Sequence, residues 1–134
     1  MNKIIPFRLK PGQDLKKSCF AFLVEQSLKS GAIISAVGSL RQACLRLAGA
    51  KETITLTGPF EITSLSGTLS LDGVHLHISL SDRKGQMIGG HLMDGCLIET
   101  TAEIVVVLME DYVFTRTQDP ETGYKELRIN SPSQ

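Results

Sequence analysis

Hydrophobic and polar positions along the chain change their period once, near residue 30. Between residues 15 and 29 the apolar side chains recur every three or four positions, which is the spacing of one face of a helix. Asp14 precedes this stretch and is placed to accept the first free N–H groups, and Ser30-Gly31 follows as a stop signal. The pattern predicts one helix from about Leu15 to Lys29, laid across a sheet.

The rest of the chain has the texture of β-strands separated by short turns. Apolar runs bounded by Gly, Pro and Asp predict strands at residues 4–9, 33–37, 39–47, 52–56, 60–71, 74–81, 86–92, 97–115 and 125–129. Because their short connections leave no room for a parallel crossover, we expect a largely antiparallel meander. Residues 100–109 are so rich in apolar side chains that we place them centrally, covered by the helix on one side and by another layer or a neighbouring subunit on the other.

These elements predict an α/β chain of the α+β type, with a mainly antiparallel β-sheet meander packed against one principal N-terminal helix. With 134 residues we expect a single domain over 1–134, ending in a frayed tail at 130–134. The longest apolar run, 104–109, is too short to cross a bilayer, and prolines and basic residues interrupt the first twelve residues where a secretory signal would be apolar. We expect no membrane span and a cytoplasmic location.

The three cysteines are widely spaced and form no C-x-x-C pair. Such cysteines are typical of small apolar core residues rather than of zinc or redox sites. We expect Cys19, Cys44 and Cys96 to be free thiols in the core.

All three histidines lie within one predicted hairpin. Residues two apart on a strand point to the same face, so His75 and His77 project together. If residues 82–85 form the turn, His91 arrives on the adjoining strand near them. If the two strands pair residues whose numbers sum to 166 or 168, His91 lies on the same face as His75 and His77. A sum of 167 would place His91 on the opposite face. Gly89-Gly90 allows a bulge or the close approach of another group.

Three neutral imidazoles that converge in this way leave an open position on a divalent ion, and zinc is the commonest such ion. We therefore predict a divalent metal, zinc, at His75, His77 and His91. The alternative is polar residues on a half-exposed strand face, or core histidines bonded to carboxylates and backbone. Glu99 and Glu103 share a parity on the next long strand, so they are candidates for hydrogen-bonding a metal ligand or moving protons, unless they are solvated or ion-paired.

Six ordered segments resemble the PPC domain (plants and prokaryotes conserved), and they cover nearly the whole chain. They are R-L-K-P-G-Q-D-L at 8–15, S-A-V-G-S-L at 35–40, F-E-I-T-S-L-S-G-T-L at 60–69, H-L-H-I-S-L-S-D at 75–82, G-G-H-L at 89–92 and T-A-E-I-V-V at 101–106. The Arg-Gly-Arg-Pro core of the AT-hook, which precedes this domain in plant nuclear proteins, is absent. The chain is therefore similar to the stand-alone prokaryotic type.

The resemblance implies a mainly antiparallel α/β fold and a homotrimer that associates through sheet and loop surfaces. It also implies that the three histidines are the metal-binding signature of the family. Phe60, Glu61 and Ile62 open the segment that resembles the partner-binding stretch of plant members, which makes them candidates for binding a protein partner. The same residues fit a core strand equally well.

Three functions stay open from the sequence. The first is a trimeric metal-binding module with a regulatory, ligand-sensing or partner-binding role. The second is a small metal-dependent hydrolase or lyase that uses a metal-bound water, although no nucleophile elbow, phosphate loop or H-E-x-x-H motif accompanies it. The third is a DNA-associated regulator with Lys16, Lys17, Arg41 and Arg46 facing phosphates, against which the formal net charge of +0 counts.

Overall fold

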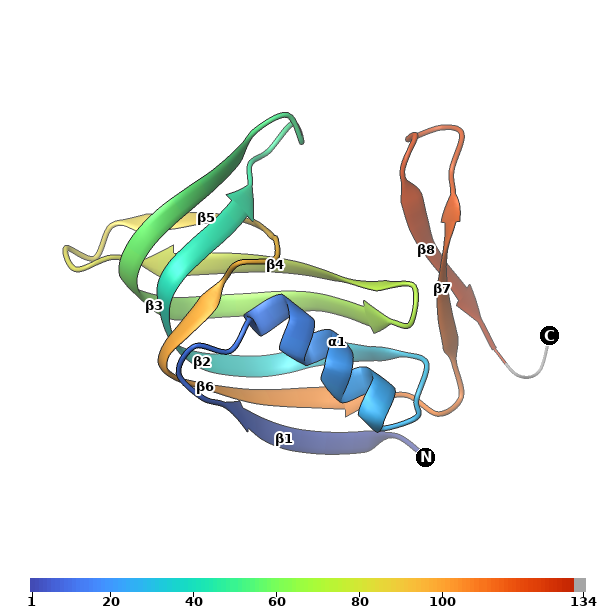
Figure 1. Cartoon of the computed structure of the whole chain (residues 1–134). Helices are drawn as coiled ribbons and strands as arrows, with labels where there is room; N and C mark the ends of the chain where they lie inside the picture. The colour runs from blue at the N-terminus through green and yellow to red at the C-terminus, as the bar shows by residue number, and fades with distance from the viewer. Residues whose placement is uncertain (132–134) are drawn as a thin grey trace.

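The computed structural model describes residues 1–131, which form one helix and eight strands (Figure 1). In chain order these are β1 (Lys3–Leu9), α1 (Leu15–Glu25), β2 (Gly31–Arg46), β3 (Thr53–Ser70), β4 (Gly73–Ser81), β5 (Met87–Leu92), β6 (Leu97–Leu108), β7 (Val113–Gln118) and β8 (Lys125–Asn130). Within the described residues, six strands form an antiparallel sheet in the order β1-β6-β2-β3-β4-β5, and β7 and β8 form a separate hairpin. The α+β class and the single domain are confirmed.

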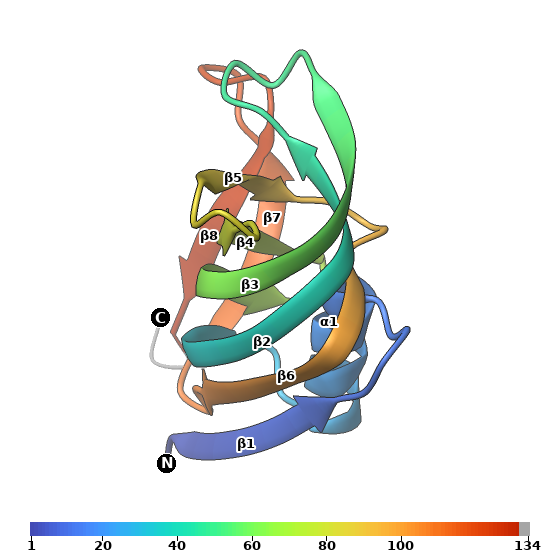
Figure 2. The same cartoon turned by 90° about the vertical axis from the view of Figure 1, so that its left-hand side faces the viewer.

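Helix α1 lies against one face of the sheet, as its apolar spacing predicts (Figure 2). Its side chains Leu15, Cys19 and Leu23, spaced four apart, are completely buried. The carboxylate of Asp14 accepts a hydrogen bond from the backbone N–H of Lys17 at 3.0 Å, which confirms it as the N-cap. This cap and this buried face fix the start of the helix and its side toward the core.

The helix ends at Glu25, before the predicted Lys29. Gln26 is the C-cap, and Ser27 has a left-handed backbone with φ of 57°. The backbone carbonyl of Lys29 instead accepts a hydrogen bond from the N–H of Phe114 at 3.1 Å. The apolar spacing continues past the true end because Leu28 packs on the core from the loop.

Two pairs of predicted strands are single long strands. The strands predicted at 33–37 and 39–47 are both part of β2, whose pairing shifts between Leu40 and Gln42 instead of breaking. The strands predicted at 52–56 and 60–71 are both part of β3. Gly58-Pro59, which separates these two predicted strands in the sequence, lies inside β3 with a cis peptide bond.

One predicted strand, 97–115, is divided instead into β6 and β7. The buried hydroxyl of Ser30 shares its one proton between the backbone oxygens of Met109 at 2.7 Å and Tyr112 at 3.0 Å, which holds the chain in a turn between the two strands. Asn130 pairs with Val113 in the resulting hairpin, so the predicted frayed tail is wrong at that residue. Ser131 follows without regular secondary structure, and the remaining residues of that prediction, 132–134, fall outside the described residues.

Strand β6 lies between β1 and β2, so the central placement of residues 100–109 is confirmed. Its alternate side chains Ala102, Ile104 and Val106 are buried in the core, while Val105 and Val107 on the opposite side are half-buried. Cover of that second side by a neighbouring subunit stays a prediction. The one helix of the described residues is not long and apolar enough to cross a membrane.

Two of the three cysteines, Cys19 and Cys96, are fully buried and Cys44 is half-buried, all as free thiols. Burial raises the pKa of Cys19 to about 12, so this thiol stays protonated and unreactive at neutral pH. The expectation of core cysteines is confirmed, with Cys44 at the margin.

The sheet closes on itself at the end of β2. Arg46 pairs with Thr53 of β3 on one side and with His91 of β5 on the other, so β2, β3, β4 and β5 form a ring of pairings. Gly90 permits this closure, because a Cβ there would lie 2.8 Å from the backbone oxygen of Arg46. The predicted close approach at Gly89-Gly90 is therefore confirmed, and the alternative of a bulge is wrong, because the β4–β5 ladder has no register shift.

Candidate metal centre

The register of the β4–β5 hairpin places all three histidines on one face. His77 lies directly opposite His91, a pairing whose numbers sum to 168, one of the two registers that sequence parity requires. His75 precedes His77 by two residues and shares its side of the strand. The intervening Leu76 and the following Ile78 are buried in the core, so the three imidazoles project from the outer face of the sheet.

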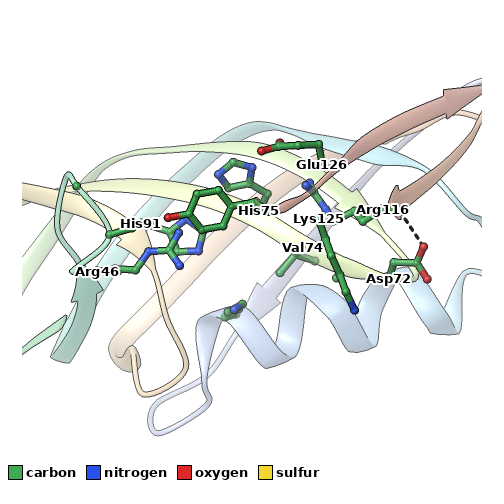
Figure 3. A pocket seen from close by; sticks show the side chains of 13 residues that line it. Arg46, Asp72, Val74, His75, His91, Arg116, Lys125 and Glu126 are labelled. Atoms are coloured by element: carbon green, nitrogen blue, oxygen red, sulfur yellow. Dashed lines mark hydrogen bonds between the residues drawn. The ribbon is translucent and has the colours of Figure 1, made fainter. Parts of the chain in front are cut away.

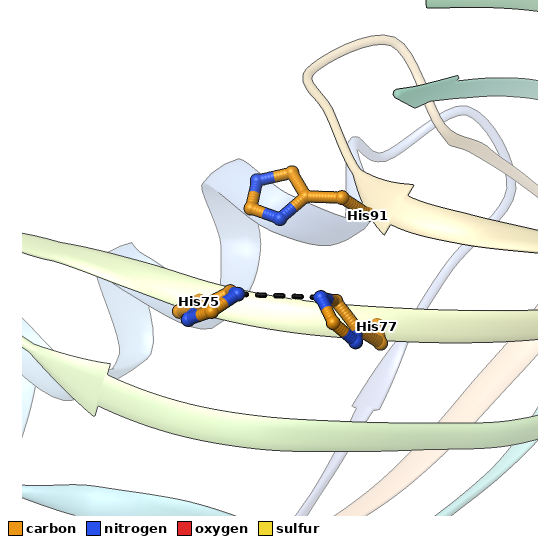
Figure 4. A group of neighbouring side chains, drawn as sticks. All are labelled: His75, His77 and His91. Carbon is orange, nitrogen blue, oxygen red and sulfur yellow. Dashed lines mark hydrogen bonds between the residues drawn. The ribbon is translucent and has the colours of Figure 1, made fainter. Parts of the chain in front are cut away.

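The three rings converge at one point (Figure 4). The Nε2 atoms of His75 and His77 are 3.3 Å apart, and one ring nitrogen from each of the three histidines lies within 4.8 Å of the others. Two nitrogens bound to one tetrahedral zinc at about 2.0–2.1 Å lie roughly 3.3–3.4 Å apart, so the first pair already has the required separation. A hydrogen bond between two neutral rings would give the same distance, but it leaves the convergence of His91 unexplained.

The environment keeps two of these rings neutral. Partial burial, helped by the positive charge of Arg46, lowers the pKa of His91 to about 4. Burial also lowers the pKa of His75, and the guanidinium of Arg116 adds to that effect. Because a histidine must be neutral to bind a metal, protons compete little with a cation for these two ligands at pH 7.

Gly67 sets how closely β3 approaches the histidine strand. It lies opposite Leu76 with φ of 144°, a backbone that other residues adopt poorly, and a Cβ there would overlap the backbone oxygen of His75. The neighbouring pairs are Thr68 with His75 and Ser66 with His77. The outer face of β3 beside the rings therefore carries small hydroxyl side chains that leave the imidazoles accessible.

The two carboxylates predicted to assist the site lie on β6. Glu99 is 3.9 Å from the guanidinium of Arg41, and the two line a separate cavity. Glu103 lies opposite Arg8 of β1 and Val37 of β2. Neither Glu99 nor Glu103 lines the cavities at the histidines. Within one subunit the two carboxylates are solvated or ion-paired, and their assistance to a metal site stays a prediction.

The partner-binding candidates Phe60, Glu61 and Ile62 lie in β3 between β2 and β4. Phe60 and Ile62 belong to the buried core, whereas Glu61 is exposed. Within one subunit the structural role of a core strand therefore accounts for the two apolar residues, and partner binding stays a prediction.

The basic residues proposed to face DNA do not form one patch. Lys16 and Arg46 line a cavity of about 630 Å³ that also contains His75 and His91, and Lys17 lines an adjacent one. Arg41 lies apart from them beside Glu99. The cavity at the histidines is also lined by residues that were not predicted from the sequence, namely Asp72, Arg116, Tyr124, Lys125 and Glu126.

The family model of the Plants and Prokaryotes Conserved (PCC) domain matches residues 1–110 of the chain. The bifunctional protein GlmU of Synechococcus sp. (strain JA-3-3Ab) is 52% identical over 127 residues, or 95% of this chain. The chain spans only 20% of the length of that relative.

Two solved structures are similar over almost their whole length. A hypothetical protein from Salmonella cholerae-suis is 41% identical with a TM-score of 0.94, covering 98% of this chain and 96% of the other. A metal-containing protein from Archaeoglobus fulgidus is 30% identical with a TM-score of 0.78, covering 94% and 93%. On the family model and these relatives, the chain belongs to the plants and prokaryotes conserved domain family, abbreviated PCC or PPC.

Proposed function

We propose that this chain is a divalent-metal-binding domain that holds zinc with His75, His77 and His91 and serves a regulatory, ligand-sensing or partner-binding role in a homotrimer. The observation that carries the proposal is the convergence of three imidazole nitrogens, within 4.8 Å of one another, from two adjoining strands. The description of the Archaeoglobus fulgidus relative as a metal-containing protein supports it.

The three histidines suit zinc in their number, and the lowered pKa values of His75 and His91 keep these two rings in the neutral form that binds a metal. Three imidazoles supply three of the four ligands of a tetrahedral ion, which leaves one position for water or a ligand, as in open sites. The rings are held on a hairpin whose other face is packed in the core, so little ordering is needed when the metal binds. When bound, zinc would act as a Lewis acid at the open position.

Self-association is supported by apolar side chains that the described chain leaves uncovered. Ile4 of β1 is 68% exposed, and Ile34 and Val37 of β2 are 53% and 55% exposed. These residues lie on strands next to β6, whose outer side chains Val105 and Val107 are half-buried. Exposed apolar groups on neighbouring strands are typical of protein contact surfaces. We expect a trimer in sedimentation equilibrium, and a monomeric mass would contradict this part of the proposal.

A small metal-dependent hydrolase or lyase is the second candidate, and one observation favours it. The cavity of about 630 Å³ beside the histidines is within the range of small-molecule sites, and it contains the carboxylates of Asp72 and Glu126. Carboxylates in such a place can transfer protons to or from a metal-bound water. In this alternative these two residues take the role that the sequence suggested for Glu99 and Glu103.

The test of the proposed function is metal analysis of protein prepared without a histidine tag. We expect wild-type protein to bind about one zinc ion per subunit and His75→Ala to lose it. The matched control is Ser79→Ala, a change on the same strand and face that leaves the ligands intact. Wild-type protein that neither contains nor takes up a divalent ion would overturn the proposal.

A further inference from the structure

The cavity beside the histidines is bounded by two separate parts of the fold (Figure 3). On one side lie His75 of β4, His91 of β5 and Arg46 of β2, all from the outer face of the main sheet. On the other side lies the β7–β8 hairpin, which contributes Arg116 and Lys125. This hairpin follows residue 110, where the family match ends, so it adds its own side chains to the metal centre.

Arg46 faces the cavity with its charge uncompensated. Directly opposed residues in an antiparallel pair share one face, so the pairing of Arg46 with His91 puts the guanidinium beside that imidazole. The neighbouring pair, Leu45 with Leu92, is fully buried on the other face. Among the residues that the structure describes, none forms a hydrogen bond or ion pair with the Arg46 side chain.

Arg116 approaches from the hairpin and is held in place. Its guanidinium donates to the hydroxyl of Thr68 at 3.1 Å, and its backbone N–H donates to the carboxylate of Asp72 at 2.9 Å. Thr68 is the β3 partner of His75, so the anchored guanidinium lies next to the histidine strand. A guanidinium fixed by one hydrogen bond retains four further N–H donors for a ligand.

The remaining cavity residues set its charge and size. Lys16 and Lys125 add two more cations, and Asp72 and Glu126 are the two carboxylates, so cations outnumber anions four to two before any metal is counted. A single inorganic anion would fill only part of about 630 Å³. Tyr124, which is 54% exposed, also lines the space and offers apolar surface to the body of a larger molecule.

We propose that this cavity binds a small organic oxyanion, a phosphate or carboxylate compound, whose anionic group lies between the guanidinium groups of Arg46 and Arg116 and the open position of the metal. The inference rests on the proposed metal site for one of these contacts. Guanidinium groups suit such ligands because their planar N–H pairs match two oxygens at once. Asp72 and Glu126 would then accept hydrogen bonds from hydroxyl or amino groups on the body of the molecule.

The experiment titrates zinc-loaded, full-length protein with phenyl phosphate, inorganic phosphate, benzoate and uncharged benzyl alcohol at constant ionic strength, using isothermal calorimetry. We expect phenyl phosphate or benzoate to bind and benzyl alcohol not to bind; the preferred anion identifies the oxyanion class. Arg46→Gln and Arg116→Gln should each weaken binding about ten- to a hundredfold. Arg83→Gln is the matched control, because Arg83 is exposed and lines other cavities.

Zinc content measured on the same samples separates the two proposals. Loss of anion binding with zinc retained in Arg46→Gln and Arg116→Gln supports the inference. Wild-type protein that binds zinc but none of the anions overturns it and leaves the metal site standing. Failure to bind zinc, with anion binding still dependent on both arginines, overturns the metal site and supports the arginine contacts alone. Equal binding by wild type and both arginine variants overturns the inference.

Discussion

Replacement of His77 by alanine separates the proposed metal binding from the stability of the fold. The His77 side chain is exposed, and its hydrogen-bond partner is another metal-ligand candidate, His75, at 3.3 Å. An exposed substitution of this kind changes the free energy of unfolding by about 0.5 kcal/mol or less. Any large change in the variant should therefore appear in metal binding and not in the unfolding of metal-free protein.

The size of the effect follows from the number of ligands. Structural zinc sites with four ligands bind with roughly 10–16 kcal/mol, or about 2.5–4 kcal/mol per ligand. His77 is one of the three proposed protein ligands. Its loss should therefore weaken zinc affinity about 10²- to 10³-fold.

The assay is competition for zinc against a chromophoric chelator, with urea unfolding of both proteins in excess chelator as the check on the fold. Ser79→Ala, two residues along on the same face of β4, should retain wild-type zinc affinity and stability. Wild-type zinc affinity in His77→Ala would refute the argument from convergence, because the site would not need one of its three converging rings.

Three further predictions concern the neighbouring backbone, pH and DNA. Gly67→Ala should lower the free energy of unfolding by about 3 kcal/mol or more and weaken zinc binding, because the added Cβ would overlap the backbone oxygen of His75. Gly73→Ala is the control for backbone strain alone, because Gly73 has φ of 132° with open space around it; it should lower the free energy of unfolding in urea by only about 1–2 kcal/mol. The lowered pKa of His91, about 4, means that the unfolded chain takes up its proton first as pH falls from about 6.5. Metal-free protein should therefore be most stable above that pH and lose about 1–2 kcal/mol by pH 4, after allowance for solvent screening, and His91→Gln should flatten the profile. With a net charge of +0, we expect no binding of duplex DNA at about 0.15 M salt in fluorescence anisotropy, whereas binding that falls steeply with salt would favour the DNA-associated function.

The features that the sequence predicted correctly depend on residues close together in the chain. The Asp14 cap acts within one helical turn, and the four-residue spacing of Leu15, Cys19 and Leu23 defines a buried face without knowledge of what covers it. The register of His77 with His91 follows in the same way, because a short turn and the period of two leave few same-face pairings.

The boundaries that the sequence missed depend on contacts from elsewhere in the fold. Gly58-Pro59 resembles a turn by composition, yet β3 continues through it because β2 shifts its register opposite. Residues 109–112 interrupt a long apolar segment because the hydroxyl of Ser30 hydrogen-bonds to two of their backbone carbonyl groups. Ser30 is about eighty residues earlier in the chain, just after the helix. Nothing in the local pattern signals either contact.

The proposed metal ligands and the groups around them therefore depend on different levels of structure. The histidines converge through a local hairpin, so their grouping is visible in the sequence. Arg46 reaches His91 only because β2 closes the sheet against β5, and Arg116 reaches the β3 hydroxyl beside His75 only because the β7–β8 hairpin packs back on the sheet. The two arginines beside the histidines can therefore be identified only from the three-dimensional fold, and not from their positions in the sequence.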